Sequence, residues 1–79
     1  MLQLKVDVGE AEPRTIVAGI ADRYALRSLV GLQVIVVVNL LPVKLRGVMS
    51  HGMLLAAGGE GVRAMVTTTA PVEPGTIIR

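Results

Sequence analysis

Gly- and Pro-containing turns divide this chain into short apolar segments, and this division constrains the fold more than any other feature. Over residues 2–8, apolar side chains alternate with polar ones. A period of two predicts a strand that is buried on one face. A polar turn ending at Pro13 follows, and residues 14–20 predict a second strand, with Ile16 and Val17 directed inward. The first two segments therefore predict a hairpin.

The remainder of the chain continues in the same manner. Asp22 is predicted to cap one short helical turn over residues 23–29, which Gly31 ends. The β-branched run at residues 33–39 predicts a strand that is buried on both faces. It is followed by a predicted loop at residues 43–49. Three further strands are predicted after this loop, over residues 51–57, 62–68 and 76–79.

Together these segments predict an all-β fold, a small antiparallel barrel with one short helical turn. The 79 residues allow a single domain, residues 1–79. Because the chain has no Phe, no Trp and one Tyr, its core must be built from Val, Leu, Ile and Met. An oligomer interface would be a second place to bury this apolar surface.

Charge and composition exclude several classes of function. The formal net charge of +2 is compatible with an ordinary surface and does not by itself indicate nucleic-acid binding. Without Cys and with one His, neither a disulfide nor a structural zinc site is expected, and no cofactor is expected either. No nucleophile–base pair, carboxylate pair or phosphate loop indicates an enzyme. No apolar run is long enough to span a membrane, and no export signal is apparent, so a cytoplasmic protein is expected.

The segment at residues 39–57 carries the candidate chemistry. Lys44 and Arg46 alternate with Leu45 within it, so their side chains are expected on one side of an extended chain. Both cations could contact phosphates, and Arg46 could do so through two hydrogen bonds. Ser50 offers a small hydrogen-bonding group, and Met53 offers either a soft surface for a base or a filler for the core.

The same segment resembles the signature of the tRNA-binding domain appended to methionyl-tRNA synthetases, which also occurs in free-standing tRNA-binding proteins and in domains similar to endothelial-monocyte-activating polypeptide. That family shows the pattern VVVxANLxPxKLxGxxSxGMxLAA. Matching residues here are Val36-Val37-Val38-Asn39-Leu40, Pro42, Lys44-Leu45, Gly47, Ser50, Gly52-Met53 and Leu55-Ala56-Ala57. Residues 2–20 resemble the preceding part of the same domain, so the likeness covers nearly the whole chain. A related domain in the β-chain of phenylalanyl-tRNA synthetases has a similar stretch, but the Tyr24 region and the Leu-Ala-Ala ending favour the methionyl type.

The resemblance implies an OB-fold that binds tRNA. It assigns tRNA contacts to the cationic segment and to the SxGM motif, which gives a predicted set of six residues: Asn39, Lys44, Arg46, Ser50, His51 and Met53. Asn39 could instead cap the loop through its own backbone. His51 and Met49 replace the Gln and Glu that the family often has, which makes this segment more positive.

The family's domain normally begins with one further strand, so residues 1–79 resemble an N-terminally shortened version. The edge left without that strand invites pairing with another chain. The first functional expectation is a non-catalytic, structure-specific tRNA-binding module that serves an aminoacyl-tRNA synthetase. The alternatives are a chaperone-like or structural homodimer that binds proteins, and an engineered or truncated barrel with little RNA binding.

Overall fold

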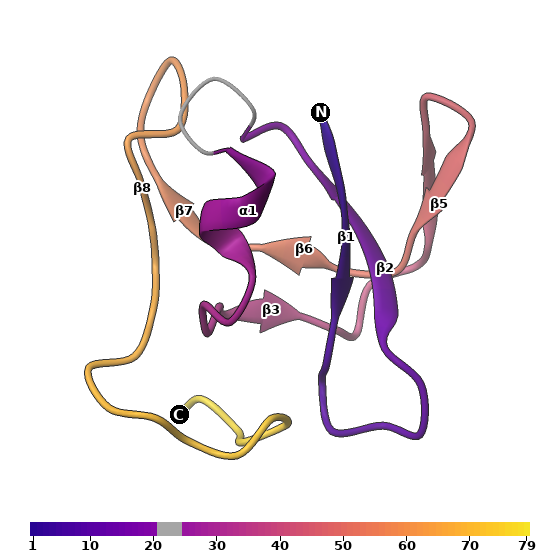
Figure 1. Ribbon diagram of the computed structural model, residues 1–79. Helices are drawn as coiled ribbons and strands as arrows, with labels where there is room; N and C mark the ends of the chain where they lie inside the picture. Colours follow the sequence, from indigo (N-terminus) through magenta and orange to yellow (C-terminus); the bar gives the residue numbers. More distant parts are fainter. Residues whose placement is uncertain (21–24) are drawn as a thin grey trace.

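The computed structural model describes residues 1–20 and 25–79 (Figure 1). Its elements are β1 (Leu2–Val6), β2 (Arg14–Ala18), α1 (Leu26–Leu29), β3 (Val36–Val37), β4 (Val43–Leu45), β5 (Val48–Ser50), β6 (Met53–Leu54), β7 (Ala56–Ala57) and β8 (Ala64–Met65). The described strands form antiparallel pairs: β1 with β2, β3 with β6, β4 with β5, and β7 with β8. The predicted all-β, barrel-like architecture with one short helix is confirmed.

The β1–β2 hairpin forms as the period-two pattern predicts. Along β1 the apolar residues are half-buried and the polar residues between them are exposed. Leu4 lies opposite Ile16 in the register, and Ile16 is completely buried. The alternation thus places one face of this hairpin against the rest of the molecule.

The central apolar segments are shorter as strands than their sequences suggest. The run at residues 33–39 forms only the two-residue β3, and Val38 is 42% exposed, so the prediction of burial on both faces is wrong. The predicted strand at 51–57 is divided into β6 and β7 at Leu55. The Leu55 amide donates to the Ile35 carbonyl (3.0 Å), and the Leu55 carbonyl accepts from the Val66 amide (3.3 Å). Leu55 therefore joins the β3–β6 pair to the β7–β8 pair.

Residues 76–79 form no strand, which corrects the prediction of a last strand there. The C-terminal segment is instead held by a side chain. The Gln33 amide donates through Nε2 to the Val72 carbonyl (2.5 Å) and accepts at Oε1 from the Val72 amide (3.0 Å). This pair of bonds replaces the ladder that a strand would have supplied.

The C-terminal segment also lies against the turn between β1 and β2. Gly9 and Gly75 both have positive φ, 83° and 88°. A Cβ on Gly9 would lie 2.8 Å from the Pro74 carbonyl oxygen, and one on Gly75 would lie 2.8 Å from the Val8 carbonyl oxygen. These glycines permit two backbones to approach closely.

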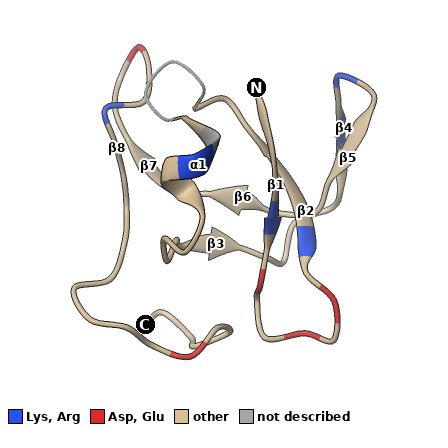
Figure 2. Ribbon diagram, in the orientation of Figure 1, with Lys and Arg blue, Asp and Glu red and all other residues tan. Residues whose placement is uncertain are grey.

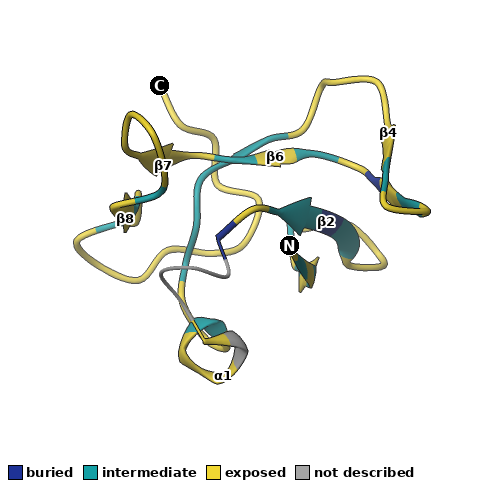
Figure 3. Cartoon of the chain, turned by 90° about the horizontal axis from the view of Figure 1, so that it is seen from above, coloured by how far each residue is buried: buried dark blue, intermediate teal, exposed yellow. Residues whose placement is uncertain are grey.

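Burial is concentrated around β2. Among the described residues the buried side chains are Ile16, Ile20 and Ser50, as Figure 3 shows by colour. A largely apolar groove of about 1120 Å³ lies between β1, residues 29–39 and the C-terminal segment.

The helical turn is shorter than predicted. It begins after Ala25, whose side chain makes no capping hydrogen bond. The predicted cap, Asp22, and the family-matching Tyr24 lie outside the described residues.

Candidate nucleic-acid interface

Residues 43–50 form a hairpin, β4 and β5, which corrects the prediction of a loop at 43–49. Its two-residue turn is Arg46-Gly47, with φ of 48° and 80°. Two positive φ values at a two-residue hairpin turn are typical of type I′, whose twist matches that of paired strands. A left-handed conformation costs a residue other than glycine about 1–2 kcal/mol, so Arg46 occupies the tip despite a local preference against it.

The hairpin has two unlike faces. Lys44 and Met49 are cross-strand partners, and both are exposed. Leu45 and its partner Val48 are half-buried, and Ser50 is buried. One face therefore lies toward the body of the molecule and the other toward solvent. Because β4 ends at Leu45, the alternation that was expected to align Lys44 with Arg46 does not extend into the turn.

Lys44 and Arg46 lie on a projecting part of the molecule, away from the acidic residues that the structure describes. The hairpin stands at the right-hand edge of the views in Figures 1 and 3. Among the described residues neither cation has an ion pair or a hydrogen bond to its side chain. Figure 2 shows the acidic residues elsewhere, in the turn after β1, near the C-terminus and beside β8. The described acids are Asp7, Glu10, Glu12, Glu60 and Glu73. Within residues 1–20 and 25–79, no acidic residue therefore neutralises the positive charge of the hairpin.

Met49 is relevant to this charge because of its position in the register. It lies directly across from Lys44. A carboxylate here, such as the Glu that the resembling family often has, would be close enough to pair with Lys44. With Met in its place, Lys44 keeps its full charge for a partner.

Ser50 does not lie on the exposed surface, contrary to the prediction that it contacts tRNA. Its side chain is buried, at 5% exposure. Its hydroxyl accepts from the Val17 amide (3.0 Å) and donates to the Gly52 carbonyl (3.1 Å). Ser50 therefore fastens the end of β5 to β2.

Replacing Ser50 by Ala is expected to lower the free energy of unfolding by about 1–3 kcal/mol, because the Val17 amide loses its acceptor in a poorly hydrated place. Urea denaturation followed by circular dichroism measures this loss. Thr69→Ala, at an exposed threonine, is the matched control and should change stability by less than about 0.5 kcal/mol. Equal stability of the two variants would show that the Ser50 bonds contribute little.

Gly52 follows in the same motif and permits close packing within the chain. A Cβ on Gly52 would lie 3.2 Å from the Ile16 Cδ1, the Val36 Cγ1 and the Val37 carbonyl oxygen. The missing side chain thus makes room for the protein's own core and backbone.

The other three predicted residues are exposed. Met53 is 53% exposed in β6, so it does not act as a core filler. Asn39 is exposed, and no hydrogen bond to its side chain is present among the described residues, which does not support the predicted backbone cap. The His51 side chain is exposed, while its amide donates to the Thr15 carbonyl (2.8 Å). These three side chains are available to a partner.

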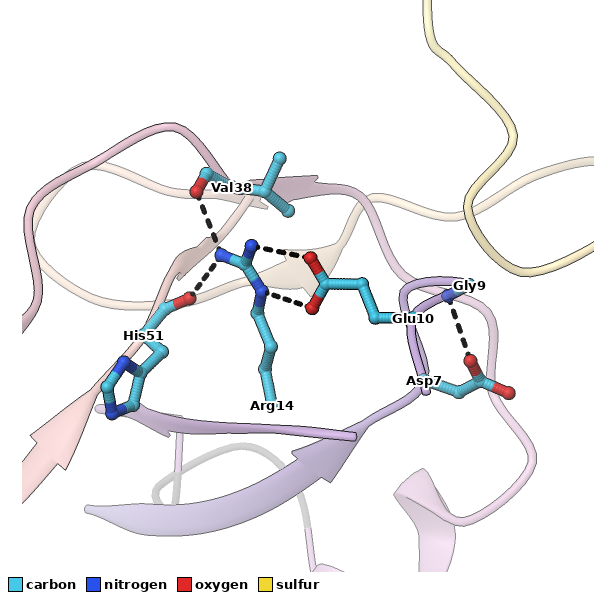
Figure 4. A network of polar contacts seen from close by, with 6 residues as sticks. All are labelled: Asp7, Gly9, Glu10, Arg14, Val38 and His51. Atoms are coloured by element: carbon cyan, nitrogen blue, oxygen red, sulfur yellow. Dashed lines mark hydrogen bonds and ion pairs between the residues drawn. The ribbon is translucent and has the colours of Figure 1, made fainter. Parts of the chain in front are cut away.

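Arg14, in β2, makes more polar contacts than its place in the sequence suggests. Its guanidinium makes a two-pronged contact with the Glu10 carboxylate and also donates to the carbonyls of Val38 and His51 (Figure 4). The hydrogen bond from Arg14 lowers the pKa of Glu10. The sequence signal was the acid–base spacing of Glu10 and Arg14, but the two carbonyl partners are distant in sequence.

Within the described ranges, no group of three or more His, Asp or Glu residues is placed to hold a metal ion. The single described helix is too short to cross a membrane.

Comparison with known proteins gives a consistent result. A family model described as a putative tRNA binding domain matches residues 1–77. Methionine–tRNA ligases from Myxococcus xanthus and Methanoregula boonei are 48% and 52% identical over 79 residues, which is all of this chain and 11% and 12% of those proteins. The chain therefore spans about a ninth of the length of these relatives. The crystal structure of the chaperone CsaA from Bacillus anthracis has a TM-score of 0.90 and 29% identity, over 98% of this chain and 74% of that one.

Proposed function

This chain belongs to the tRNA-binding domain family, and on that premise we propose that it is a non-catalytic module that binds folded tRNA through the β4–β5 hairpin. The observation that carries this proposal is the pair of unneutralised cations, Lys44 and Arg46, on a projecting hairpin. Phosphates attract such cations and release bound counterions on contact. Asn39, His51 and Met53 are exposed and would extend the contact surface.

Folded RNA suits this surface better than a flexible single strand does. Proteins that bind single strands on an OB-fold usually stack the bases on aromatic side chains. This chain has no Phe, no Trp and one Tyr. A surface that offers cations and little stacking favours recognition of the shape and phosphates of a structured RNA.

The module would act as an accessory to an aminoacyl-tRNA synthetase. The methionine–tRNA ligases above contain a closely similar segment within a much longer protein. A tRNA-binding module joined to a synthetase raises the local concentration of tRNA at the catalytic part. We assign the barrel to the OB type and the protein to the cytoplasm, where such enzymes use tRNA, on the strength of the same family resemblance.

The test is a salt series with bulk tRNA, together with duplex and single-stranded RNA of equal length. Each phosphate contact contributes about 0.7–0.9 to the slope of log Kobs against log salt. Two hairpin cations therefore predict a negative slope with a magnitude of at least about 1.4, with tRNA bound more tightly than either control RNA. Equal affinity for all three RNAs, or affinity that is independent of salt, would contradict the proposal.

A second candidate is a chaperone-like homodimer that binds apolar segments of other proteins. The apolar groove between β1 and the C-terminal segment favours it, as does the likeness to the chaperone CsaA. In the described residues β1 is paired on one edge, to β2. Light scattering would detect a dimer. Binding of a labelled apolar peptide, without any binding of tRNA, would select this candidate over the first.

A further inference from the structure

The Arg14 guanidinium joins the two ends of the segment that carries the cationic hairpin. Residues 39–50 leave the barrel after Val38 and return to it at His51. Arg14 Nη1 donates to the Val38 carbonyl (2.8 Å) and to the His51 carbonyl (3.0 Å). A single nitrogen thus bonds the residues on both sides of segment 39–50, as Figure 4 shows.

The guanidinium itself is held in place. Nε donates to one Glu10 oxygen (2.9 Å) and Nη2 to the other (2.8 Å), a geometry that fixes the plane of the group. A guanidinium has five N–H donors, and these contacts together with the two carbonyls use most of them. The Arg14 side chain is 24% exposed. Little of its hydrogen-bonding capacity is left for an external ligand.

The two ends of the excursion are not equally secured without Arg14. The returning end is fixed to β2 at other points, through the His51 amide and the Ser50 hydroxyl. On the side that leaves the barrel, residues 39–42 are exposed, and they have no hydrogen bonds among the described residues. The bond from Arg14 to the Val38 carbonyl is therefore the last polar attachment before β4 begins.

We propose that Arg14 is a positioning residue for RNA recognition, which sets the direction in which the β4–β5 hairpin leaves the barrel without itself contacting the RNA. This inference rests on the proposed function for its link to tRNA. The structural part of the inference, that the Arg14 bonds to the Val38 and His51 carbonyls orient the hairpin, does not depend on the proposed function. Lys at position 14 would keep the positive charge but could not bridge Glu10 and two carbonyls at once.

The experiment is a double-mutant cycle between Arg14→Lys and the pair Lys44→Ala plus Arg46→Ala, with tRNA affinity as the readout. In the otherwise unchanged protein, Arg14→Lys is expected to weaken binding about tenfold. In the background without the hairpin cations it should weaken binding less than about twofold, because the residue acts through them. Equal losses in both backgrounds, or full binding by Arg14→Lys, would overturn the proposal.

A measurement without RNA separates this inference from the proposed function. Amide order parameters over residues 43–50 should fall in Arg14→Lys while those of β1 stay unchanged. If the unaltered protein fails to bind tRNA, the proposed function fails. Reduced order in the hairpin of Arg14→Lys would still support the structural claim that Arg14 orients the hairpin. Unchanged order parameters in the hairpin would contradict the proposal that Arg14 orients it, whatever the binding result. Glu10→Gln weakens the contact between Glu10 and Arg14 but leaves the Arg14 bonds to the two carbonyls. It should lower the hairpin order parameters and the tRNA affinity by an intermediate amount, and it replaces Arg14→Lys if that variant does not fold.

Discussion

Replacing Ile16 by Ala is expected to lower the free energy of unfolding by about 2–5 kcal/mol, the range found for large aliphatic side chains cut back in a packed core. Ile16 is completely buried in β2, opposite Leu4, and its Cδ1 packs beside Gly52. Small domains have a total stability of about 5–15 kcal/mol, and this chain belongs near the lower end of that range. The variant should therefore unfold at markedly lower urea concentration.

Urea denaturation followed by far-ultraviolet circular dichroism gives the comparison. Ile16→Val removes one methylene group and should cost about 0.5–1.5 kcal/mol. Val30→Ala, at a side chain that is 83% exposed, is the control and should be nearly neutral. If Ile16→Ala and Val30→Ala proved equally stable, the core would have to lie elsewhere than around β2.

Removing both hairpin cations, Lys44→Ala with Arg46→Ala, is expected to weaken tRNA binding roughly 30- to 100-fold at about 50 mM salt. Each cation is exposed and lacks a protein partner among the described residues, so its charge is available to a phosphate. The loss of two contacts should also reduce the magnitude of the salt slope by about 1.4–1.8. Fluorescence anisotropy with labelled tRNA at several salt concentrations measures both quantities.

The matched control removes two exposed cations outside the hairpin, Arg63→Ala with Arg79→Ala. It changes the net charge by the same amount, yet should weaken binding only about twofold. Met49→Glu gives an independent check, because the new carboxylate would lie across from Lys44 and partly neutralise it. If the control pair weakened binding as much as the hairpin pair, net charge rather than the hairpin would govern recognition.

The sequence predicted well those features that depend on local patterns. Alternation in residues 2–8 was sufficient to predict β1, the position of its apolar face and the hairpin with β2. The long Val/Ile run at 33–39 was overestimated as a strand, because β-propensity does not determine how many residues find a partner at the right register. Only two of them do.

The hairpin at 43–50 was missed because its turn sequence, Arg46-Gly47, lacks the Asn or Asp that usually precedes Gly in a type I′ turn. Because no strands were predicted at residues 43–50, the sequence did not show which face of the hairpin Ser50 would occupy. Once β4 and β5 are known, the alternation of side chains along a strand places Ser50, the neighbour of the exposed Met49, on the inner face. The exposure of Met53 likewise depended on its pairing with Val37.

The hydrogen bonds of Arg14 to two backbone carbonyls could not be predicted from local sequence patterns. Its carbonyl partners lie 24 and 37 residues further along the chain, and backbone carbonyls leave no mark in the sequence. The nearby Glu10 was visible, but an acid four residues from an Arg usually indicates a modest surface pair.

The distance between the hairpin cations and the described acidic residues has a consequence for how the protein meets a polyanion. The Gly9–Gly75 approach brings the turn bearing Asp7 and Glu10 beside the C-terminal turn bearing Glu73, while the cations of the β4–β5 hairpin lie at another edge. A molecule with a net charge of only +2 is weakly attracted as a whole, so the placement of individual charges matters more than their sum. If the hairpin binds RNA as proposed, we expect its two cations to lead the approach to the polyanion and to raise the association rate above the value that the net charge alone would give.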